Sequence, residues 1–82
     1  MLSNDSKFIL EQGKLLYESR YREEMEKLHP GGFFCIEPVS GRYWVGRTLD
    51  DAVNAAGEEM PDCLTYTLQI GRGAAVHLGM LQ

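Results

Sequence analysis

The sequence has few cysteines and no long apolar run. Its two cysteines, Cys35 and Cys63, permit at most one disulfide bond. No segment approaches the roughly 20 consecutive apolar residues that a membrane-spanning helix needs. The first residues, MLSNDSKF, are polar and do not form the apolar core of a signal peptide. We therefore expect a cytoplasmic protein without a membrane segment, in which both thiols stay reduced.

An excess of basic residues is also absent. The formal net charge is −4, whereas a nucleic-acid-binding surface needs clustered lysine and arginine. Arg42, Arg47 and Arg72 are dispersed along the second part of the chain. They would form a nucleic-acid interface only if the fold brought them together, so we do not expect nucleic acid as a partner.

Catalytic and metal-binding patterns are sparse. The possible zinc ligands are His29, Cys35, Cys63 and His77, and no two of them are closer than six residues. Structural zinc sites instead present ligands in close pairs. Neither cysteine is predicted to lie at a helix N-terminus, the position that lowers a thiol pKa. We therefore predict no metal, no cofactor and no catalytic residue, and we expect a protein that is not an enzyme, although the sequence leaves that question open.

The 82 residues are predicted to form one α+β domain. Residues 1–28 form an amphipathic helix, because Tyr17, Tyr21, Met25 and Leu28 recur at helical spacing with Leu10 one or two turns earlier. The sequence His29-Pro30-Gly31-Gly32 ends this helix. Residues 33–82 form a ββαβ(β) core.

The core begins with a hairpin of two strands, 33–38 and 42–46. A helix over 49–60 follows, with Thr48 as its N-cap and Gly46 at the turn from strand to helix. Residues 64–70 alternate between apolar and polar side chains, which predicts a half-buried strand, and 74–81 can form a last strand. We predict a two-layer fold with a mainly antiparallel sheet and the 49–60 helix on one face. The first helix packs beside that helix or reaches out to a partner.

The faces of the two hairpin strands can be predicted from alternation. Phe34 and Ile36 are expected to face the core, because the opposite set includes the charged Glu37. Tyr43 and Trp44 lie on opposite faces of the second strand, so both faces carry large aromatic surface. That surface must be covered by the first helix, by a second copy or by another protein. The candidate binding surface consists of Arg42, Tyr43, Trp44, Arg47, Tyr66, Tyr17 and Tyr21.

Several short motifs resemble a family of small uncharacterised bacterial proteins. They are His29-Pro30-Gly31, Ile36 with Ser40-Gly41, Tyr43 to Thr48, Asp51-Ala52, Pro61-Asp62 and Ile70-Gly71. This resemblance covers about two thirds of the chain and implies no activity. The segment from Gly46 to Ala52 is also similar to the G-x-T-x-x-E-A segment of HicB-like antitoxins, with Asp51 in place of the usual glutamate. Those antitoxins have a three-strand meander where this sequence has a hairpin, and they lack its long N-terminal helix. The similarity implies a small toxin as partner.

The sequence therefore predicts a small non-enzymatic protein that binds another protein or associates with itself, with a homodimer as one form. An antitoxin-like role is the specific version of this prediction. The alternative is a ligand-binding protein or small enzyme that uses Arg42, Tyr43, Arg47 and Cys35 around a cleft beside the sheet.

Overall fold

The computed structural model describes residues 4–72 and 75–79, with side chains for residues 7–72. The N-terminal helix consists of α1 (Asn4–Leu16), a π-helical turn η1 (Tyr17–Tyr21) and α2 (Arg22–Leu28). The remaining elements are β1 (Phe33–Glu37), β2 (Arg42–Gly46), α3 (Leu49–Glu59), β3 (Thr65–Gln69) and β4 (Ala75–Gly79). The predicted α+β class is confirmed, and each predicted element is present. Residues 1–3 of the predicted 1–28 helix lie outside the described residues.

The four strands form one antiparallel sheet in the order β2-β1-β3-β4. The predicted hairpin is confirmed, with Phe33 opposite Gly46 and Glu37 opposite Arg42. β1 lies inside the sheet, between β2 and β3, because β3 returns along its other side after α3. The two ends of the predicted last strand, Ala74 and residues 80–81, lie outside the described residues.

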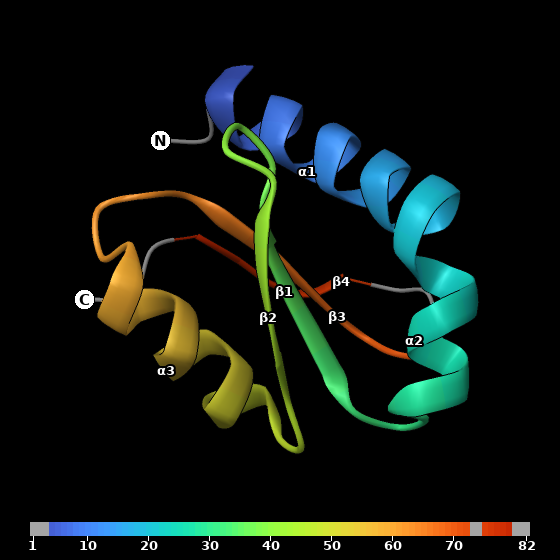
Figure 1. The fold of residues 1–82 in the computed structure, drawn as a ribbon. Coiled ribbons are helices and arrows are strands. Elements are labelled where there is room, and N and C mark those ends of the chain that lie inside the picture. The colour runs from blue at the N-terminus through green and yellow to red at the C-terminus, as the bar shows by residue number, and fades with distance from the viewer. Residues whose placement is uncertain (1–3, 73–74, 80–82) are drawn as a thin grey trace.

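The helices cover opposite faces of this sheet, so the two-layer arrangement is corrected to three layers (Figure 1). Phe34 and Ile36 face the N-terminal helix and pack with Ile9, Tyr17 and Met25. Cys35, Trp44, Ala52 and Ala56 form a second cluster between the sheet and α3. The physical reason is that alternate residues of β1 are apolar on both faces, so each face requires a cover.

Glu37 lies on the side of β1 that we expected to face solvent, yet it is buried. Its carboxylate accepts hydrogen bonds from the backbone N–H groups of Val39 and Ser40, at 3.0 and 2.8 Å. The charged side chain is therefore satisfied by the hairpin turn that follows it rather than by water. The prediction that this face of β1 is exposed relied on the charge of Glu37 and is therefore wrong.

The π-helical turn keeps Met25 on the same buried side of the N-terminal helix as Tyr17. Ile9, Tyr17 and Met25 recur every eight residues and are all buried. Over eight residues an α-helix of 3.6 residues per turn drifts by about 80°. The wider turn η1 takes up an extra residue and returns Met25 to the sheet. The predicted stripe is wrong at its ends, because Leu10 and Leu28 are 37% and 61% exposed.

The joint between β2 and α3 is explained by local packing. The Thr48 hydroxyl accepts a hydrogen bond from the Asp51 backbone N–H at 3.1 Å, which confirms the predicted N-cap. A Cβ atom on Gly46 would lie 2.5 Å from the Ala52 nitrogen and 2.7 Å from the Asp51 Cβ. Gly46 is therefore required because the first turn of α3 folds back onto it.

Candidate functional site

A cluster of four aromatic rings lies between the N-terminal helix and the hairpin. The Tyr17 ring is centred 5.0 Å from that of Phe34, and the Tyr21 ring lies 4.8 Å from that of Tyr43. Phe34 and Tyr43 stack at 5.3 Å. Burial decreases across the cluster from Tyr17, which is 1% exposed, to Tyr43, which is 41% exposed. The cluster therefore anchors the helix to the sheet and leaves one ring open to solvent at the β2 side.

The remaining predicted tyrosine, Tyr66, is buried under α1. Tyr21 is half-buried, so Tyr43 is the most accessible tyrosine of the predicted binding surface. On this face of the sheet, the aromatic surface is covered mainly by the chain's own N-terminal helix. Of the three covers that the sequence left open, the first helix covers Tyr66, and its own Tyr17 packs against the sheet.

Trp44 and Arg42 belong to the opposite face, next to α3. The Trp44 ring is 9% exposed, and the Arg42 guanidinium carbon lies 5.8 Å from its centre. The same guanidinium forms an ion pair with Glu59 at the end of α3. Glu59 was not among the predicted residues, because only the antiparallel placement of α3 over β2 brings it near Arg42. The contacts on this face therefore hold the hairpin against α3.

β2 is one of the two terminal strands of the described sheet, and its outer edge has no partner strand among the described residues. The Ile70 N–H donates to the Gly32 carbonyl at 2.8 Å, and antiparallel bonding alternates along a strand. The backbone N–H and C=O groups of Phe34 and Ile36 therefore form hydrogen bonds with β3. Those of Cys35 form hydrogen bonds with Trp44 of β2. It follows that the backbone groups of Tyr43 and Val45 point away from the sheet.

No described segment pairs with this edge, since β2 is a terminal strand of the sheet. In Figure 1, β2 lies in front of the other strands, with α3 on one side of it and the N-terminal helix on the other. The edge therefore combines the outward N–H and C=O groups of Tyr43 and Val45 with the exposed Tyr43 ring. We call these two residues the β2 edge. Val45 was not in the predicted site, and its importance depends on the strand order.

Arg47 lies beyond the end of β2, beside a surface hollow. The hollow is lined by Leu28, His29, Pro30, Gly31, Gly32, Val45, Gly46 and Arg47. Arg47 is exposed and forms no ion pair with any residue in the described part of the chain. It is thus a cation available to a partner that approaches this end of the β2 edge.

The three arginines that would form a nucleic-acid interface are not brought together. Arg42 and Arg47 lie at opposite ends of β2, which spans roughly 16 Å at about 3.3 Å per residue. Arg72 follows β3, whose last residue, Gln69, is opposite Phe33, so Arg72 is at the Arg47 end. Arg42 is in addition paired with Glu59.

The alternative cleft around Cys35 is not assembled either. Cys35 is fully buried on the α3 face of β1, whereas Tyr43 lies on the other face of the sheet. Burial raises the pKa of the Cys35 thiol, and hydrogen bonds with Thr67 and Thr65 oppose this rise. A buried thiol with a raised pKa is a poor nucleophile.

Cys63 is half-buried and forms no disulfide with Cys35. It lines an apolar hollow between α1, the hairpin turn and the start of β3, together with Phe8, Ile9, Val39, Met60 and Leu64. No cluster of potential metal ligands occurs among the described residues. The side chain of His77 in β4 lies outside the described part of the chain.

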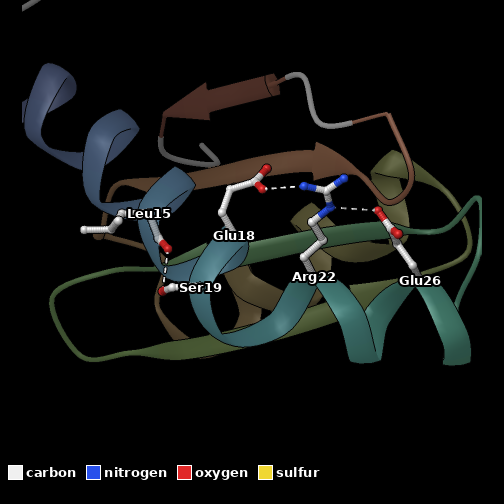
Figure 2. A network of polar contacts seen from close by, with 5 residues as sticks. All are labelled: Leu15, Glu18, Ser19, Arg22 and Glu26. Atoms are coloured by element: carbon white, nitrogen blue, oxygen red, sulfur yellow. Dashed lines mark hydrogen bonds and ion pairs between the residues drawn. The ribbon is translucent and has the colours of Figure 1, made fainter.

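The solvent side of the N-terminal helix carries a short charged network (Figure 2). Arg22 bonds to Glu18 at 2.9 Å and to Glu26 at 3.3 Å, each one helical turn away. The Ser19 hydroxyl donates to the Leu15 carbonyl at 2.7 Å, at the start of the π-helical turn. Ion pairs as exposed as these add little to the stability of a helix, because water and salt screen them. We read them as helix support.

Among the described helices, none has the length and apolar character needed to cross a membrane. Comparison of the chain with protein-family models, with curated proteins and with solved structures gives no match.

Proposed function

We propose that this protein acts by binding another polypeptide along the β2 edge, without catalysis. The observation that carries the proposal is the pair of outward backbone positions, Tyr43 and Val45, on a terminal strand. A strand with free N–H and C=O groups can accept an extended segment as an additional strand. The exposed Tyr43 ring supplies apolar contact beside those groups.

The flanking side chains support a partner with an acidic group at one end. Arg47 is unpaired among the described residues and lies just past the edge. It could therefore pair with a carboxylate of the added strand. The antitoxin-like role is a specific form of this proposal, in which the partner is a small toxin, and its support is the local similarity from Gly46 to Ala52.

The test is affinity capture from the native host with three tagged forms of the full chain. Val45→Pro removes an outward N–H that the sheet does not use and blocks strand addition. Leu15→Lys is the control, because it changes an exposed apolar residue on the helix away from the edge. We expect a protein, or an untagged copy of this chain, to be captured by the wild type and by Leu15→Lys but not by Val45→Pro. Thermal unfolding verifies that both variants are folded. Capture of the same proteins by a folded Val45→Pro variant would overturn the proposal.

A further inference from the structure

We infer that the partner of the β2 edge is a second copy of this chain, joined in a two-fold antiparallel β2–β2 pair. This inference rests on the proposed function and adds the identity of the partner and its register. It would join two four-stranded sheets into one continuous sheet.

The first argument is that the β2 edge is complementary to itself. In an antiparallel pair, outward-pointing residues must lie opposite outward-pointing residues. Of the registers that satisfy this rule, the one centred on Trp44 pairs all five residues of β2, from Arg42 to Gly46. It places Tyr43 opposite Val45 of the second copy. The N–H and C=O groups of Tyr43 then form hydrogen bonds with those of Val45 in the second copy. By the two-fold symmetry, Val45 of the first copy pairs with Tyr43 of the second in the same way.

The second argument comes from the side chains in that register. Tyr43 and Val45 both project to the face that carries the N-terminal helix. In the pair, each Tyr43 ring therefore lies next to a Val45 side chain of the other copy. An aromatic residue opposite a β-branched residue is a favourable cross-strand pair. The 41% exposed surface of Tyr43 would thereby be covered.

The third argument concerns what protects sheet edges. Terminal strands are commonly kept from pairing by an inward charge, a proline or a bulge. Within β2 the three central residues, Tyr43, Trp44 and Val45, include none of these. The charged Arg42 stands at the end of the strand and is held by Glu59 on the α3 face.

The first measurement is light scattering across a concentration series, combined with amide hydrogen exchange. We expect the mass to rise from that of one chain to twice that value. The Tyr43 and Val45 amides should exchange rapidly at low concentration and become at least tenfold slower as the dimer forms. Val45→Pro should remain at the mass of one chain. Because each copy has a net charge of −4, added salt should strengthen the dimer.

The outcomes separate the two proposals. A single-chain mass at all concentrations, with both amides exchanging rapidly, would overturn the two-fold pair and leave the edge open to a different protein. Slow exchange of both amides in a monomer would show that the edge is already covered, and would overturn both proposals.

The second measurement tests the register by disulfide formation in a Cys63→Ser background. Tyr43→Cys and Val45→Cys are prepared separately and then mixed under oxidising conditions. In this register the Cα atoms of Tyr43 and the opposite Val45 lie about 5.5 Å apart, which is within disulfide range. The Cα atoms of the two Tyr43 residues, or of the two Val45 residues, lie about 8 Å apart, which is too far. We expect a disulfide-linked dimer in the mixture and little in either variant alone. Equal linkage in all three samples would overturn the register.

Discussion

The backbone of Gly13 in α1 lies directly against the ring of Tyr66 in β3. A Cβ atom on Gly13 would be 2.7 Å from Tyr66 Cδ2 and 2.8 Å from its Cβ and Cγ. Glycine normally weakens a helix interior, so its presence here is explained by this close approach. The contact sets how near the N-terminal helix lies to the sheet.

The first prediction is that Gly13→Ala destabilises the protein although alanine is the better helix former. The gain in helix propensity is about 1 kcal/mol, whereas overpacking against a buried ring costs typically about 1–3 kcal/mol. We expect a net loss in the free energy of unfolding, measured by urea denaturation. The matched control is Asn54→Ala on the exposed side of α3, which should stabilise by a few tenths of a kcal/mol. A more stable Gly13→Ala variant would contradict the close approach.

The second prediction concerns the N-cap of α3. Thr48→Ala removes the oxygen that accepts the Asp51 N–H, and should lower the free energy of unfolding by about 1 kcal/mol. Thr48→Ser keeps an equivalent hydroxyl and should stay close to the wild type. Equal losses for serine and alanine would show that the Thr48 methyl group, and not the cap, matters.

The third prediction is a loss of stability at alkaline pH. Burial is the largest cause of the raised pKa of Tyr17, followed by Glu26 and Glu18, and burial also raises the pKa of Tyr66. Because the folded-state pKa values lie above the unfolded value of 10.0, folding favours the neutral phenols. This contribution is complete below pH 10.0 and is lost as the pH rises through the folded values.

Unfolding by urea from pH 7 to 11 measures this effect, and Tyr17→Phe should flatten the alkaline decline. Among the described residues no group forms a normal hydrogen bond with the Tyr17 hydroxyl, although the Gly71 backbone lies near it. The phenylalanine variant should therefore be close to the wild type in stability at pH 7. An unchanged alkaline decline in Tyr17→Phe would assign the effect to other groups.

The fourth prediction distinguishes the two thiols. Cys63 is half-buried beside an apolar hollow, whereas Cys35 is fully buried with a raised pKa. A thiol reagent should modify one cysteine per native chain, identified as Cys63 by peptide mass mapping. Cys35 should react only after denaturation. Rapid modification of Cys35 in the native protein would mean that α3 opens readily from the sheet.

Much of the fold follows from local sequence patterns. The hairpin, the Thr48 cap and the β3 alternation depend on neighbouring residues, so they could be predicted without the structure. The number of layers could not be predicted in this way, because it depends on which helix covers which face of β1. Glu37 was misassigned for a related reason, since its hydrogen bonds to the following turn replace those to water.

The candidate site was only partly predictable. Tyr43 was identified from its aromatic ring, whereas Val45 and Glu59 become relevant only through strand order and the position of α3. Tyr17, Trp44 and Tyr66 were assigned to a binding surface because large aromatic rings need a cover, which the sequence alone could not identify. The chain covers them itself.

The pairing of α1 with β3 has a consequence for how the protein is made. The buried side of α1 around Ile9 and Gly13 packs against the ring of Tyr66, which lies in β3, more than 50 residues later in the sequence. A chain emerging from the ribosome exposes this side of the helix until β3 has been synthesised. The N-terminal layer therefore cannot complete its packing before β3 is available, and an emerging chain presents chaperones with a helix that still lacks its sheet.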